Sequence, residues 1–120
     1  MNIQRSERVL ETIPVGSLGL IPLPSCKELG RKVNEYLVQW RRESALVHKN
    51  TIAFQGYEQD SYLIEASIPR FGSGEAKGIV QESVRGRDLY LMVDVCNHSL
   101  TYSLCGKTNC MSPDDHYQDL

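Results

Sequence analysis

Apolar residues recur with strand-like and helix-like spacing in separate stretches of the chain. Residues 17–23 form a short apolar run that ends at two prolines, Pro22 and Pro24, and this pattern predicts a buried strand. A helix is expected directly after it, because apolar residues follow at intervals of three and four. The members of this apolar stripe are Leu29, Val33, Tyr36, Leu37 and Trp40.

The predicted helix has recognisable ends. Ser25 and Glu28 have the spacing of a capping box, in which the hydroxyl and the carboxylate accept hydrogen bonds from each other's backbone N–H groups. Arg41 and Arg42 suit the last turn, where cations interact favourably with the helix dipole. Gly30 makes the helix about 1 kcal/mol less stable than alanine would at this position. A close approach of the helix to a sheet would offset this cost, and we therefore expect one at Gly30.

Alternation of apolar and polar residues returns in the second half of the chain. Residues 62–68 alternate and predict a strand that Pro69 ends. Its apolar face would carry Tyr62, Ile64, Ala66 and Ile68. Further strands are expected over residues 77–84 and 89–95, and a short edge strand over residues 51–54. The 89–95 stretch is nearly all apolar, which is typical of a strand covered on both faces.

The last two predicted elements are short. Residues 98–104 alternate strictly, which predicts a half-exposed strand, and residues 106–109 read as the turn that follows. Ser112 and Pro113 predict the start of a helix, with a capping hydroxyl followed by proline at the first helical position. Few residues follow, and so short a helix is not stable by itself. We therefore expect the chain to be a piece of something longer.

This order of elements predicts an α/β fold with a mainly parallel sheet flanked by helices. Residues 1–14 are polar and unpatterned and are expected to form a flexible arm, while residues 15–120 form one incomplete domain. A chain of 120 residues that is 41% hydrophobic is long enough for one core.

Composition excludes several classes of function. Thirteen Lys and Arg against fifteen Asp and Glu give a net charge of −2, which argues against nucleic acid as the main partner. No apolar run approaches the ~20 residues that span a bilayer, so no membrane association is expected. The charged N-terminal segment lacks the apolar core of a secretory signal, and a cytoplasmic location is therefore expected.

Two groups of residues could hold a metal ion. Cys96, His98, Cys105, Cys110 and His116 lie close together in sequence, although their spacing departs from the Cys-x₂₋₄-Cys pairs of structural zinc sites. A buried apolar role for the cysteines is the simpler interpretation. The carboxylates near the C-terminal end could bind a hard cation or could simply favour a helix start. They are Asp114, Asp115 and Asp119.

Two consecutive motifs carry a family resemblance. Residues 70–75, Arg-Phe-Gly-Ser-Gly-Glu, and residues 82–88, Glu-Ser-Val-Arg-Gly-Arg-Asp, are similar to motifs that follow each other at this separation in ribose-phosphate pyrophosphokinases. The family patterns are Arg-Phe-x-Asp-Gly-Glu and Glu-Ser-Val-Arg-Gly-x-Asp. Residues 29–33, 89–93 and 112–120 are similar to its first helix, its next strand and a later helix. The chain thus resembles a divergent N-terminal domain of this family.

The resemblance implies a phosphoribosyltransferase-like fold, a homo-oligomer and a Mg²⁺-dependent transfer of diphosphate from ATP to ribose 5-phosphate. Phe71, Ser73 and Glu75 match the positions that contact ATP, and Ser73 replaces an acidic residue there. Ser83 and Arg85 match positions that contact a regulatory phosphate at subunit interfaces. Because Gly72 and Gly74 flank Ser73 and Pro69 ends the preceding strand, we expect the Phe71 ring to point outward.

No catalytic residue is assigned in the chain. The family's Asp-Asp-x-x-x-Thr-Gly-Gly-Thr motif, which binds the ribose phosphate, does not occur in the 120 residues. The resemblance therefore implies part of an ATP site and a subunit interface, without activity in this chain alone. Two alternatives remain: a non-catalytic regulatory relative that associates with synthetase subunits, and a small zinc-binding module. Residues 45–60 and 98–110 exceed the family's usual length.

Overall fold

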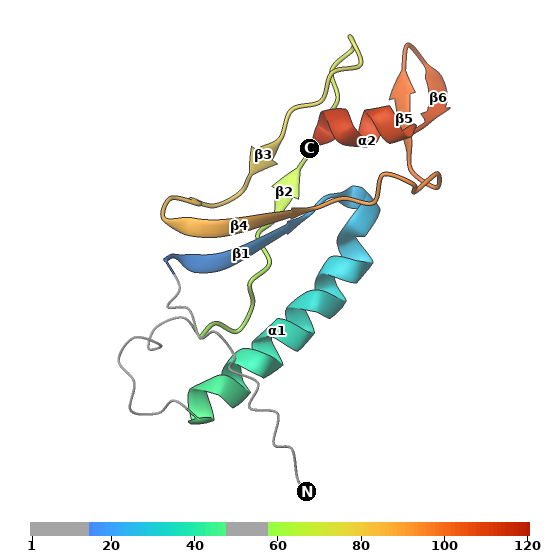
Figure 1. Cartoon of the computed structure of the whole chain (residues 1–120). Coiled ribbons are helices and arrows are strands. Elements are labelled where there is room, and N and C mark those ends of the chain that lie inside the picture. Colours follow the sequence, from blue (N-terminus) through green and yellow to red (C-terminus); the bar gives the residue numbers. More distant parts are fainter. Residues whose placement is uncertain (1–14, 48–57) are drawn as a thin grey trace, which may run out of the picture.

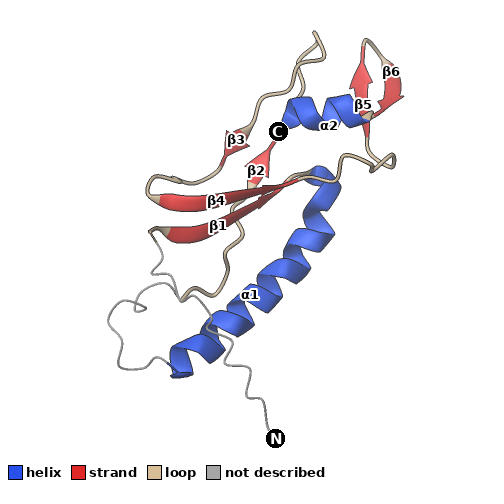
Figure 2. Ribbon diagram, in the orientation of Figure 1, coloured by secondary structure: helices blue, strands red, loops and turns tan. Residues whose placement is uncertain are grey.

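The computed structural model describes residues 15–47 and 58–120. The expected arm, residues 1–14, and the expected edge strand, residues 51–54, lie outside this described part. Figures 1 and 2 show the arrangement of the elements. In chain order they are β1 (Ser17–Pro22), the 3₁₀ helix η1 (Pro24–Cys26), α1 (Lys27–Val47), β2 (Ala66–Ser67), β3 (Ile79–Val80), β4 (Arg87–Met92), β5 (Thr101–Leu104), β6 (Lys107–Cys110) and α2 (Pro113–Asp119).

The described residues form a mixed α/β structure around a small parallel sheet. Strand β1 pairs with β4 in parallel, with Ser17 opposite Arg87 and Pro22 opposite Met92. An isolated parallel bridge joins Leu20 of β1 to Leu63. The pairs β2–β3 and β5–β6 are antiparallel. The expected α/β class is therefore found at this coarse level, but the expected mainly parallel sheet is not, because only one of the three strand pairs in the described residues is parallel.

The core lies where α1 covers one face of the β1–β4 pair (Figure 1). Leu20, Val38 and Tyr62 form its buried cluster. The backbone N–H of Leu20 donates to the carbonyl of Tyr62 at 2.8 Å, and the N–H of Ile64 donates to the carbonyl of Leu20, also at 2.8 Å. The buried Asn34 Oδ1 accepts from the N–H of Tyr62 at 2.7 Å. Backbone hydrogen bonds therefore join residues 62–64 to β1, and Asn34 ties them to α1.

Gly30 marks the predicted close approach between helix and sheet. A Cβ atom at this position would lie 2.5 Å from Cβ of Pro22 and 2.8 Å from its Cγ. Glycine therefore permits the first turns of α1 to pack directly on the end of β1.

The predicted buried face of this helix is partly wrong. Gly30, Asn34 and Val38 are the buried residues of α1, whereas Trp40 and Tyr36, two members of the predicted stripe, are each 60% exposed. The close contact at Gly30 and the hydrogen bond of Asn34 rotate the helix away from the orientation that its apolar residues alone favour. The helix also continues beyond its predicted end, to Val47.

The predicted capping box at the start of this helix is also wrong. Pro24–Cys26 form a 3₁₀ turn before α1, and the Ser25 hydroxyl accepts a hydrogen bond from the N–H of Asp94 at 3.0 Å. The predicted start of the last helix is confirmed. The N–H of Asp115 donates to the Ser112 hydroxyl at 3.2 Å, and the N–H of Ser112 donates to the Asp115 carboxylate at 2.9 Å.

The strands are shorter and more exposed than the sequence predicts. The alternating exposure of residues 62–68 is confirmed, but only Ala66–Ser67 pair as β2. The stretch predicted as a strand over residues 77–84 pairs only at Ile79–Val80. Strand β4 is not covered on both faces, because Tyr90 is 62% exposed and Leu91 is 49% exposed.

The hairpin of β5 and β6 turns earlier than predicted. Cys105 has a φ of 51° and Gly106 a φ of 74°, so these two residues make the turn in the left-handed region. Residues 107–109, predicted as part of the turn, therefore belong to strand β6 (Lys107–Cys110). None of the described helices has the length and apolar character needed to cross a membrane.

Candidate functional site

The candidate site is a closed loop between β2 and β3, defined here as the 70–76 loop. An antiparallel bridge joins Arg70 to Ala76. Inside the loop the N–H of Phe71 donates to the carbonyl of Glu75 at 2.7 Å, and the N–H of Gly74 donates to the carbonyl of Phe71 at 2.9 Å. Gly74 has a φ of 94°, a conformation that favours glycine. The loop is therefore a tight turn with its own hydrogen bonds.

The three residues matched to ATP contacts, Phe71, Ser73 and Glu75, are all exposed on this loop. Phe71 is 52% exposed, so the expectation that it points outward is confirmed. A Cβ atom built at Gly72 would meet no atom within 4 Å apart from its chain neighbours, so the space at this position of the loop is open. The loop can therefore offer an aromatic surface, a hydroxyl and a carboxylate to a ligand.

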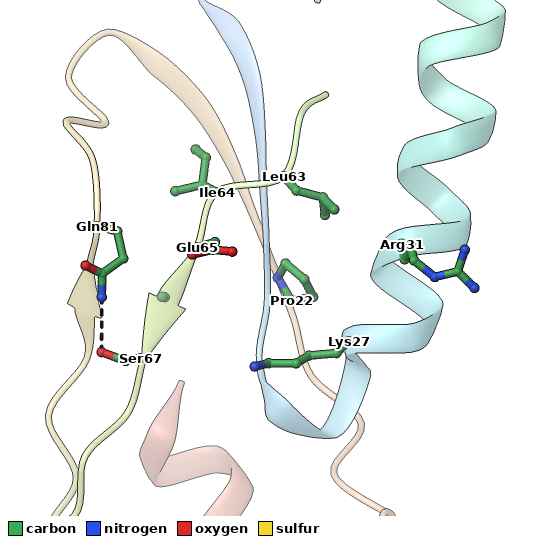
Figure 3. A pocket seen from close by; sticks show the side chains of 9 residues that line it. Pro22, Lys27, Arg31, Leu63, Ile64, Glu65, Ser67 and Gln81 are labelled. Atoms are coloured by element: carbon green, nitrogen blue, oxygen red, sulfur yellow. Dashed lines mark hydrogen bonds between the residues drawn. The ribbon is translucent and has the colours of Figure 1, made fainter. Parts of the chain in front are cut away.

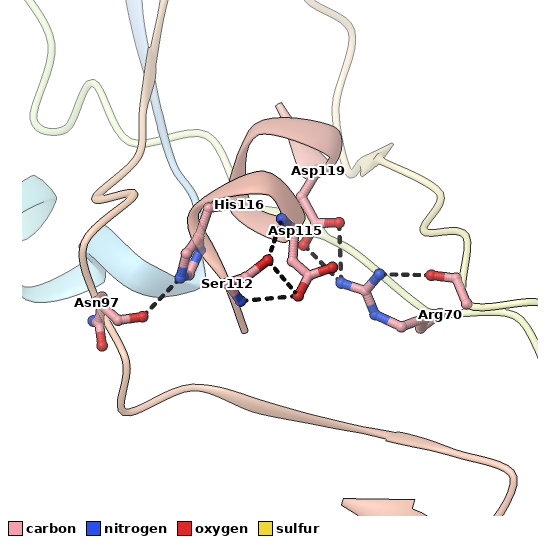
Figure 4. A network of polar contacts seen from close by, with 7 residues as sticks. Arg70, Asn97, Ser112, Asp115, His116 and Asp119 are labelled. Atoms are coloured by element: carbon pink, nitrogen blue, oxygen red, sulfur yellow. Dashed lines mark hydrogen bonds and ion pairs between the residues drawn. The ribbon is translucent and has the colours of Figure 1, made fainter. Parts of the chain in front are cut away.

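Arg70 connects this loop to the C-terminal part of the chain (Figure 4). Its Nη1 donates to the carbonyl of Gly74 at 2.7 Å. Its Nη2 donates to both carboxylate oxygens of Asp119, at 3.0 and 2.9 Å. The guanidinium carbon lies 4.5 Å from the ring centroid of Tyr102, within the range of a cation–π interaction. Sequence reasoning missed this contact set, because its members come from three separate segments.

Two of the three carboxylates predicted as possible ligands of a hard cation have other partners. Asp119 pairs with Arg70, and Asp115 caps helix α2. The backbone hydrogen bond from Ser112 is the main reason that the pKa of Asp115 is lowered, and the Ser112 hydroxyl and the charge of Arg70 act in the same direction. These residues therefore stabilise the C-terminal helix rather than forming a cation site.

His116 links the same helix, through Asn97, to the 3₁₀ helix η1 that precedes α1. Its side chain is among the most buried, at 2% exposure, and its Nε2 lies 2.7 Å from the carbonyl oxygen of Asn97. The side-chain amide of Asn97 in turn donates to the carbonyl of Ser25 at 3.2 Å. Helix α2 is thus tied through His116 and Asn97 to η1, and through Asp119 to the 70–76 loop.

The residues proposed for zinc do not come together. Cys96, Cys105 and Cys110 are exposed free thiols, and His98 is exposed as well. Within residues 15–47 and 58–120 no group of three or more His, Cys, Asp or Glu side chains is placed to hold a metal ion. The described residues therefore do not form the zinc site that the alternative interpretation requires. Cys26 is a buried free thiol, and burial is the main reason that its pKa is raised.

Ser83 and Arg85 lie away from the 70–76 loop. Both side chains are exposed in the connection between β3 and β4, which Figure 1 shows at the opposite end of β3 from that loop. The neighbouring Arg87 pairs with Glu82 at 3.2 Å. The two resemblance-derived sites are therefore separate surfaces in the described part of the chain.

A cavity of about 410 Å³ lies between the first turns of α1 and the strand β2 (Figure 3). Lys27 and Arg31 line one wall, while Glu65, Ser67 and Gln81 line the other. Arg31 is also paired with Glu35 at 2.6 Å. Sequence reasoning missed this cavity because its walls come from distant segments. The sequence feature that could have indicated it is the pair Lys27 and Arg31, two cationic residues one helical turn apart.

Comparison of the chain with protein-family models, with curated proteins and with solved structures finds no match.

Proposed function

We propose that the chain is a phosphoribosyltransferase-like α/β half-domain of the ribose-phosphate pyrophosphokinase type, which contributes part of an ATP site and a subunit interface. The observation that carries this proposal is the exposed Phe71 on a loop whose backbone is closed by hydrogen bonds. A large aromatic side chain that does not serve the core, held beside a carboxylate, is suited to recognising a nucleobase.

The chemistry of the loop fits the adenine end of a nucleotide. The face of Phe71 can stack on the purine ring, and the Glu75 carboxylate can accept a hydrogen bond from its exocyclic amine. The Ser73 hydroxyl forms a neutral hydrogen bond, whereas the carboxylate of the acidic residue in the family pattern accepts a charge-assisted one. Charge-assisted hydrogen bonds are roughly twice as strong as neutral ones. We therefore expect weaker binding of ATP than an acidic residue at this position would give.

Mg²⁺ enters the proposal only together with the ATP phosphates. The described residues do not gather three or more metal-binding side chains, so no metal site of the chain itself is proposed. Because the ribose-phosphate motif does not occur in the sequence, the 120-residue chain is expected to make no phosphoribosyl pyrophosphate. Turnover of ATP and ribose 5-phosphate above that of a heat-inactivated sample would contradict this expectation.

The proposed interface rests on exposed apolar side chains and on the second motif. Tyr36 and Trp40 on α1 lie with ring centroids 6.1 Å apart and are both largely exposed, as is Tyr90 on β4. Exposed apolar groups of this size favour contact with a partner, here another copy of the chain. Ser83 and Arg85 would add a phosphate contact at such an interface, since the Arg guanidinium pairs well with phosphate oxygens.

Calorimetric titration with MgATP tests the nucleotide site. We expect binding by the wild-type chain and at least ~10-fold weaker binding by Phe71→Ala, because base–aromatic stacking contributes about 1–3 kcal/mol. Leu46→Ala is the matched control, since Leu46 is also a large exposed apolar residue but lies on α1, outside both the loop and the proposed interface. Equal affinities of all three proteins would contradict the proposed role of the loop. Association with synthetase subunits without ATP binding would favour the non-catalytic relative instead.

A further inference from the structure

Three elements meet at one partly buried guanidinium. The side chain of Arg70 is 13% exposed and that of its partner Asp119 is 7% exposed. Arg70 belongs to the 70–76 loop, Asp119 is the last residue of α2, and Tyr102 lies on β5. Figure 4 shows the guanidinium between the loop backbone and the carboxylate.

The contacts of Arg70 act directly on the conformation of the loop. The 2.7 Å hydrogen bond from Nη1 to the Gly74 carbonyl spans the loop from its base toward its tip. Nη2 is held by both carboxylate oxygens of Asp119, while Nη1 bonds the loop, so the two ends of the guanidinium are fixed by different elements. Hydrogen bonds between a guanidinium and a carboxylate are charge-assisted and roughly twice as strong as neutral ones. If the guanidinium turns away, the loop loses a bond that its own backbone does not replace.

The β5–β6 hairpin supports the loop from a second side. The Tyr102 ring lies under the guanidinium, and a Cβ atom built at Gly74 would lie 3.8 Å from both terminal methyl groups of Leu104. Both contacts come from β5, at positions two residues apart. These residues share one face of the strand, because side chains alternate between faces. The hairpin thus presents one face to the loop.

We propose that Arg70 is a positioning residue that makes the conformation of the 70–76 loop depend on the docking of α2 and the β5–β6 hairpin. Movement of either element removes a contact of the guanidinium and releases the Gly74 carbonyl. The consequence for nucleotide binding rests on the proposed function: any partner that displaces α2 or the hairpin reorients Phe71 and weakens the site. The coupling itself concerns the loop alone and can be tested without nucleotide.

Amide–water exchange measured by NMR on the full chain tests this coupling. In Asp119→Asn, which removes the charge of the carboxylate, we expect the amides of Phe71 and Gly74 to exchange at least ~10-fold faster. The amides of Leu20 and Ile64, which are bonded inside the core, should keep their rates. Tyr102→Leu should also accelerate the loop amides, whereas Tyr102→Phe should not, because it keeps the ring beneath the guanidinium.

Glu35→Gln is the control for a general effect of ion pairs, since Glu35 forms an exposed pair with Arg31 on α1. It should leave all four amide rates unchanged. Unchanged loop rates in Asp119→Asn would overturn the proposal, and so would an equal acceleration of loop and core amides, which would indicate a purely global effect on stability. Faster loop exchange in a chain that does not bind MgATP would keep the coupling and reject the nucleotide site.

Discussion

Arg70 and Phe71 are adjacent in sequence but have opposite surroundings. The Arg70 side chain is 13% exposed and has carboxylate, carbonyl and aromatic partners, while Phe71 is 52% exposed. The arginine therefore organises the 70–76 loop and the phenylalanine is displayed by it. In a chain whose core is built from residues such as Ile64, at 1% exposure, this exposed ring is free to contact a ligand.

Truncation of this ring should cost little stability. We expect Phe71→Ala to change the free energy of unfolding by less than about 1 kcal/mol, as for exposed positions. Ile64→Ala, in contrast, should cost about 2–5 kcal/mol because it leaves a cavity in the core. Urea denaturation followed by circular dichroism measures both values. A loss for Phe71→Ala as large as that for Ile64→Ala would show that Phe71 is a core residue.

At the level of elements, the capping pattern in the sequence predicted the start of α2 correctly but not the start of α1. Ser112 and Asp115 form the capping box expected of their sequence. Ser25 has the same pattern with Glu28, yet its hydroxyl accepts from the distant Asp94 instead. A capping pattern identifies residues that can accept a backbone hydrogen bond, but a tertiary partner competes for the same hydroxyl.

The cap of α2 should make stability depend on pH. The pKa of Asp115 is lowered in the folded chain, chiefly by the backbone hydrogen bond from Ser112. The stabilisation is therefore complete above the pKa of the unfolded carboxyl, about 4, and is lost as the pH falls through the lower folded pKa. We expect the difference in unfolding free energy between wild type and Asp115→Asn to shrink from pH 6 to pH 3.

Denaturant titrations across this pH range measure that difference. Asp114→Asn is the control, because Asp114 is an exposed residue in the same helical turn, and its effect should vary less with pH. A difference for Asp115→Asn that is constant from pH 6 to pH 3 would contradict the assigned role of this carboxylate.

The limits of the sequence prediction are set by tertiary contacts. The strand at Ser17–Pro22 and the close approach at Gly30 could be predicted, because an apolar run and a helical glycine are local signals. The buried face of α1 could not, because it depends on the hydrogen bond between Asn34 and the N–H of Tyr62. The outward position of Phe71 was predicted from its flanking residues, but the role of Arg70 depends on a partner 49 positions away.

At the scale of the whole molecule, the apolar surface left open by the fold predicts self-association. The mass measured by light scattering should rise above 13.6 kDa as the concentration increases. Trp40→Lys should weaken association at least ~10-fold, because it removes an exposed aromatic side chain of the proposed interface and introduces a charge there. Gln39→Lys, which adds the same charge at the adjacent exposed position, should have less effect. A monomer at all concentrations would contradict the proposed interface.

The most direct test of the central claim is an NMR measurement of contacts between MgATP and the chain. The account predicts nuclear Overhauser effects between the adenine protons and the ring protons of Phe71, and their loss in Phe71→Leu, which keeps an apolar side chain but removes the aromatic face. Adenine contacts confined to another surface, such as the cavity beside Lys27 and Arg31, or the absence of any contact at saturating MgATP, would contradict the assignment of the 70–76 loop as a nucleotide platform.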